Sequence, residues 1–109
     1  MPRRQNGGVE YTFESELWRW TARRELWVFA SLPPAMSDDI DAIPRPPHGF
    51  ASIPVRATIG ATSWTTSIFP DNDRGSYSLP IRKAVRTAEG LELGQTVTVT
   101  VELVGLEGR

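Results

Sequence analysis

Apolar and polar residues alternate most regularly close to the C-terminus. Aliphatic residues occupy every second position, at Val97, Val99, Val101 and Leu103. The positions between them are polar: Thr96, Thr98, Thr100 and Glu102. This period of two is typical of a strand with one buried and one exposed face. Burying four aliphatic side chains contributes about 6–10 kcal/mol of gross transfer energy, so we expect this face to form the core.

A short helix is expected directly before this strand, because apolar residues recur there at helical spacing. These residues are Ile81, Ala84, Val85 and Ala88. Ser78 and Pro80 suit the first turn of a helix, and Gly90 suits its left-handed end. A second short helix is expected over residues 35–43, with Ser37 as a candidate cap.

Four further segments have the pattern of strands. They cover residues 9–17, 26–32, 50–59 and 62–69. Trp18 and Trp20 continue the first of these segments on the face opposite Phe13 and Leu17. We therefore expect at least one of the two tryptophans to be exposed or to cover a second cluster. Segments 44–49 and 70–76 have the Pro, Gly and Asp content of loops.

These elements predict a mostly β fold, a small closed or split β-barrel with two short helices. Leu32-Pro33 and Leu79-Pro80 each end a strand that is followed by a helix, a turn and another strand. This similarity has two interpretations, coincidence or two halves related by a pseudo-twofold axis. Residues 1–8 are expected to be a flexible tail, and residues 9–109 a single barrel domain.

Composition narrows the classes of function. The 109 residues contain no Cys and carry a net charge of −1. A chain without Cys has no disulfide framework or thiolate metal site, which suits the cytoplasm. The near-neutral charge argues against nucleic acid as a partner. No apolar run approaches the ~20 residues of a membrane span, and MPRRQNGG lacks the apolar run of a secretory signal.

No pattern of catalytic or metal-binding residues is visible. The one histidine, His48, falls in a Pro-rich segment for which we expect a surface loop. No Gly-x-Ser-x-Gly motif, phosphate-binding glycine loop or metal-ligand spacing occurs. The sequence therefore predicts no catalytic residue, no cofactor and no metal.

One set of polar residues is a candidate binding site: Arg56, Ser67, Tyr77, Lys83 and Arg86. Cationic and hydroxyl groups brought together at one end of the barrel would suit a carboxylate or a phosphate. The alternative is that the charged members are solvated and pair with Glu89 or Asp71.

The tryptophans allow two interpretations. Trp18, Trp20, Trp27 and Trp64 could stack on nucleobases or sugars, but such residues more often fill the core or the mouth of a barrel. For Trp64 we expect substantial burial beside the core.

The sequence resembles a known family across most of its length. The residues that carry the resemblance are Phe13, Leu17, 27–33, Phe50, 55–60, 64–70 and 77–101. They are similar to the uncharacterised bacterial family called domain of unknown function 1905, which implies a split β-barrel and no established activity. Residues 79–101 more distantly resemble AbrB-type swapped-hairpin DNA-binding domains, which usually have an Asp where this chain has Gln95.

Three functions are therefore open. The first is a non-enzymatic binding or accessory module, whose partner is a small anionic ligand or another protein. The second is a DNA-binding domain of the AbrB-like type. The third is an enzyme of unknown class with a site around Tyr77 and Arg86.

Overall fold

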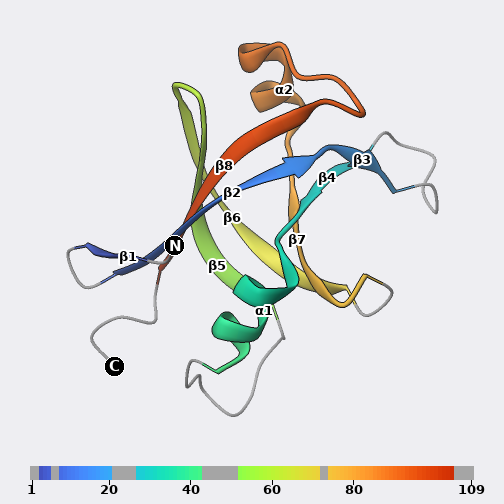
Figure 1. The fold of residues 1–109 in the computed structure, drawn as a ribbon. Coiled ribbons are helices and arrows are strands. Elements are labelled where there is room, and N and C mark those ends of the chain that lie inside the picture. The colour runs from blue at the N-terminus through green and yellow to red at the C-terminus, as the bar shows by residue number, and fades with distance from the viewer. Residues whose placement is uncertain (1–2, 6–7, 21–26, 43–51, 72–73, 105–109) are drawn as a thin grey trace.

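The computed structural model describes residues 3–5, 8–20, 27–42, 52–71 and 74–104 (Figure 1). Over these ranges the strands are β1 (Arg3–Gln5), β2 (Gly8–Glu16), β3 (Trp18–Arg19), β4 (Val28–Ser31), β5 (Ile53–Ile59), β6 (Thr62–Asp71), β7 (Ser76–Pro80) and β8 (Thr96–Leu103). The helices are α1 (Pro34–Asp41) and α2 (Lys83–Glu89). The predicted fold class, mostly β with two short helices, is confirmed. Within the described ranges, no helix has the length and hydropathy needed to cross a bilayer.

The strands form one antiparallel sheet in the order β1-β2-β8-β5-β6-β7-β4-β3. Strands β2 and β3 are separated only by Leu17, so one bent stretch pairs with β8 before the bend and with β4 after it. The sheet consequently curls into a barrel-like shape, with α1 and α2 at opposite ends (Figure 1). The Leu17 side chain is 2% exposed, its N–H donates to the Gln95 carbonyl at 2.9 Å, and its carbonyl accepts from the Gly94 N–H at 2.9 Å.

The strand pairing is consistent with the interpretation of the internal repeat as two halves related by a pseudo-twofold axis. The two strands that precede the helices, β4 and β7, pair with each other, and so do the two that follow, β5 and β8. Both pairs are antiparallel, as two halves related by a pseudo-twofold axis would require. Within the predicted tail, Arg3–Gln5 pairs with β2; the division into a tail of residues 1–8 and a domain of residues 9–109 stays a prediction.

The aliphatic face of β8 forms the middle of the core, as predicted. Val97, Val99, Val101 and Leu103 are all buried. Val99 lies opposite Phe13 in β2, and Val101 lies between Tyr11 of β2 and Ala57 of β5. Trp64 of β6 is partly buried and packs against this core, so its predicted position is confirmed.

The predicted start of the second helix is wrong. Ser78 and Pro80 belong to β7, because this segment pairs with β4 and buries Leu79 completely, opposite Ala30. Helix α2 begins only after Arg82 and ends at Gly90 (φ 63°), the predicted left-handed residue. Ile81 and Val85 are buried, but Ala84 and Ala88 are exposed, so the apolar face is narrower than expected.

Ser37 does not cap the first helix, which begins one turn earlier with Pro33 at the cap position. Ser37 is instead 3% exposed inside α1, where its Oγ accepts a hydrogen bond from the Tyr77 N–H at 3.0 Å. The Tyr77 hydroxyl donates to Asp41 Oδ1 at 2.7 Å. These two hydrogen bonds attach α1 to β7.

Tyr11 provides a test of how the core responds to pH. Burial raises the pKa of the Tyr11 phenol above 10.0, and the charge of Asp39 raises it further. A raised pKa stabilises the fold below the ordinary tyrosine pKa, and this contribution is lost as the pH rises through the folded-state value. We expect the free energy of unfolding of the wild type to fall more steeply than that of Tyr11→Phe above about pH 10. Urea unfolding of both proteins between pH 7 and 11 measures this, and parallel profiles would contradict it.

Candidate functional site

Aromatic side chains cover the outer face of the sheet where β3, β4 and β7 lie side by side. The strand register aligns Trp18 with Phe29 and Phe29 with Pro80, which places the three residues in one row across the strands. Trp20 and Trp27 form the next row, where the Trp20 N–H donates to the Trp27 carbonyl at 2.9 Å. Trp18 and Trp20 therefore belong to a second cluster, as expected. Of the four tryptophans in the chain, only Trp64 packs against the core.

Phe29 lies at the centre of this cluster. It stacks with Trp18 at a centroid distance of 5.2 Å and with Trp27 at 6.1 Å. Trp20 meets Phe29 edge-on at 5.9 Å. Offset and edge-on contacts of this kind stabilise aromatic clusters. Phe29 is only 7% exposed although it points away from the core, because the three tryptophans surround it.

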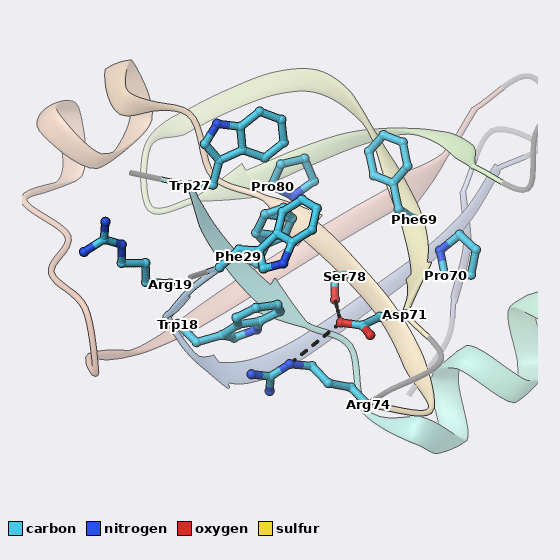
Figure 2. A pocket seen from close by; sticks show the side chains of 11 residues that line it. Trp18, Arg19, Trp27, Phe29, Phe69, Pro70, Asp71, Arg74, Ser78 and Pro80 are labelled. Atoms are coloured by element: carbon cyan, nitrogen blue, oxygen red, sulfur yellow. Dashed lines mark hydrogen bonds and ion pairs between the residues drawn. The ribbon is translucent and has the colours of Figure 1, made fainter. Parts of the chain in front are cut away.

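The cluster borders an open groove of about 880 Å³ (Figure 2). Phe69 of β6 stands on the far side of the groove from Trp18 and is 46% exposed. Trp20 and Trp27 are 40% and 36% exposed. Large apolar side chains that remain exposed together in a groove mark an interaction site more often than singly exposed ones do.

The rim of the groove beside Trp18 is polar and held in place. The Arg74 guanidinium carbon lies 3.6 Å from the centre of the Trp18 ring, a cation–π contact. Arg74 Nε is 3.8 Å from Asp71 Oδ2, and the Ser78 hydroxyl donates to the same oxygen at 3.4 Å (Figure 2). Trp18 is fixed in turn, since its Nε1–H donates to Ser31 Oγ at 2.9 Å.

A smaller hollow of about 290 Å³ adjoins the groove. The two share Trp27, Phe29 and Pro80, and the hollow adds side chains from Val28 and from the start of α2. Those from the start of α2 include three cations, Arg82, Lys83 and Arg86. The aromatic surface therefore ends beside a cationic one.

The structure brings two of the five predicted site residues together. Lys83 is exposed and Arg86 half-buried, and both line the smaller hollow. Arg86 Nε donates to the Ile81 carbonyl at 3.3 Å, which holds its side chain against the start of α2. Whether these two residues bind an anion stays a prediction.

The other three predicted residues lie elsewhere. Arg56 is exposed on β5 opposite Glu102, and Ser67 lies on β6 opposite Pro54. Tyr77 is 4% exposed and binds α1 at the opposite end of the sheet from α2 (Figure 1). The sequence could not place these residues because their convergence depended on how both helices pack.

The groove was not among the predicted sites, although a signal for it exists. Aromatic residues occur at i and i+2 on both sides of the turn, as Trp18 with Trp20 and as Trp27 with Phe29. Two such pairs in consecutive antiparallel strands share one face when the register aligns them. The predicted turn at residues 21–25 and the loop with His48 lie outside the described residues. Within the described ranges, no three His, Asp or Glu side chains come together as a metal ion would require.

Comparison with known proteins identifies the family. The sequence profile described as Domain of unknown function (DUF1905) matches residues 13–101. The chain belongs to this family. The DUF1905 match runs from Phe13 in β2 to Val101 in β8, and it includes every described residue that lines the groove and the hollow. No protein with a curated description matches the chain.

Proposed function

We propose that this protein is a non-enzymatic binding module whose ligand lies in the aromatic groove. One observation carries the proposal: Trp20, Trp27 and Phe69 remain 36–46% exposed around a single open groove. Apolar surface of this kind loses water favourably when a ligand covers it. Flat rings or apolar groups on the ligand would stack on the exposed tryptophans.

The lining residues support binding rather than catalysis. A nucleophilic hydroxyl needs a neighbouring base and access to the substrate. Ser78 is the one hydroxyl side chain among the described lining residues, and it is 3% exposed. It donates to Asp71, which also contacts Arg74. The alternative enzyme site around Tyr77 and Arg86 gains no support, because the two residues belong to opposite ends of the sheet.

A dye measures the binding capacity of the groove directly. We use 8-anilinonaphthalene-1-sulfonate, which joins two aromatic ring systems to an anionic group. We expect saturable binding at one site and a blue-shifted emission from the folded protein. Trp27→Ala combined with Phe69→Ala should weaken this binding at least tenfold, because each ring contributes on the order of 1 kcal/mol or more of contact energy.

Two controls make this result specific. Leu93→Ala removes an apolar side chain that is 49% exposed and lies outside the groove, so dye binding should not change. Phe69→Ala alone should give an intermediate loss of dye binding. This single variant keeps the proposal testable if the double variant does not fold. Equal binding by the wild type and a folded double variant, judged by circular dichroism and thermal midpoint, would refute the proposal.

A further inference from the structure

The positive charges of the described residues are concentrated around the aromatic groove. Of the six lysine and arginine side chains that the structure describes, five line the groove or the adjoining hollow. These five are Arg19, Arg74, Arg82, Lys83 and Arg86. Only Asp71, among the ten described carboxylates, lines either of them. A chain with a net charge of −1 thus presents a locally cationic face.

The cations flank the aromatic rings on two sides. Arg19 and Arg74 border the groove that contains Trp18 and Trp20. Lys83 and its neighbours at the start of α2 border the hollow beyond Trp27. Arg74 already contacts the Trp18 ring and pairs with Asp71. Arg19 and Lys83 have exposed side chains. Exposed positive charge therefore borders both the groove and the adjoining hollow.

We infer that the groove binds single-stranded nucleic acid. This inference rests on the proposed function, since it names the ligand class of the same groove. Unpaired bases stack on exposed aromatic side chains irrespective of sequence, and cations along the same groove follow the phosphates. Five cations spread over the groove and the hollow fit several phosphates of one strand better than the phosphate of a mononucleotide. A duplex fits poorly, because its bases are stacked on one another and do not reach a flat aromatic surface.

From the sequence alone, the near-neutral net charge argued against nucleic acid as a partner. Net charge is a sum over the whole chain, whereas phosphates respond to charges within about one Debye length, ~10 Å at 0.1 M salt. The described acidic residues lie mainly elsewhere, for example Glu10, Glu14 and Glu16 on β2. Charge separated in this way permits local attraction to a polyanion.

The test is a fluorescence anisotropy titration with fluorescein-labelled dT10 and rU10 in 50 mM and 200 mM KCl. We expect saturable binding that weakens with salt, and at least a tenfold loss for Trp27→Ala combined with Phe69→Ala. Arg19→Ala combined with Lys83→Ala should make the negative slope of log K against log[KCl] shallower by about 1.4, which corresponds to the loss of two phosphate contacts on a single strand. Arg56→Ala is the matched control. Among the cations whose side chains the structure describes, Arg56 is the one that lines neither the groove nor the hollow, so this variant should bind like the wild type.

Competitors separate this ligand class from others. Unlabelled dT10 should displace the probe, whereas inorganic polyphosphate of similar charge should compete at least tenfold less well. Equal competition by polyphosphate, or tighter binding of a 10-base-pair duplex, would overturn the inference. Dye binding without oligonucleotide binding would overturn the ligand class alone. A second copy of the chain that occupies the groove and excludes the oligonucleotide would also overturn the ligand class alone. Absence of both would overturn the proposed function as well.

Discussion

Val99→Asp is expected to prevent folding. Val99 is fully buried in β8 and lies opposite Phe13, at the middle of the core. An unpaired carboxylate at this position either stays charged at a cost of several kcal/mol or takes up a proton with a raised pKa. That cost is comparable with the whole stability of a small domain, roughly 5–15 kcal/mol. Circular dichroism and thermal unfolding measure the effect.

The neighbouring residue provides the control for this substitution. Thr98 lies in the same strand, next to Val99, but its side chain faces solvent, opposite Glu14. Thr98→Asp introduces the same charge and adds only a solvent-exposed repulsion, which should cost less than about 1 kcal/mol. A soluble Val99→Asp protein that melts at the same temperature as Thr98→Asp would show that the aliphatic face of β8 is not the core.

Leu17→Ala is expected to lower the free energy of unfolding by about 2–5 kcal/mol, the range for truncating a buried leucine. Leu17 is 2% exposed and lies where β2 bends into β3. Its loss leaves a cavity that the neighbouring backbone cannot easily fill, because the Leu17 N–H and carbonyl both hold the segment before β8. Urea unfolding monitored by tryptophan fluorescence gives this free energy.

Leu93→Ala is the matched control for the same chemical change. Leu93 is 49% exposed, so its truncation should change the free energy of unfolding by less than about 0.5 kcal/mol. Equal losses for the two variants would mean that the bend at Leu17 is not a fixed part of the barrel.

The sequence was most informative where one local pattern determined an element. The alternation in β8 predicted its buried face, and Gly90 predicted the end of α2, because both depend on residues a few positions apart. The start of α2 was misplaced because Ser78 and Pro80 suit either a helix start or a strand end. Pairing of β7 with the distant β4 decided in favour of the strand.

The site was harder to predict, because it depends on register between strands. Trp18, Phe29 and Pro80 form one row only through two successive strand pairings. Lys83 and Arg86 were likewise hard to place, because the helix pattern does not show that Trp27 and Phe29 line the same hollow. Composition and net charge average over such arrangements, so they could not indicate a cationic aromatic face.

The place of β8 in the sheet has a consequence for synthesis of the chain. The last strand that the structure describes, β8, lies between β2 and β5, which are both made earlier. Until Thr96–Leu103 has left the ribosome, these two strands present unpaired edges, and exposed edges promote association between chains. Val9 also pairs with Leu103, far away in the sequence, and such long-range pairing slows folding. Nascent chains of this protein should therefore depend on chaperones that shield strand edges during translation.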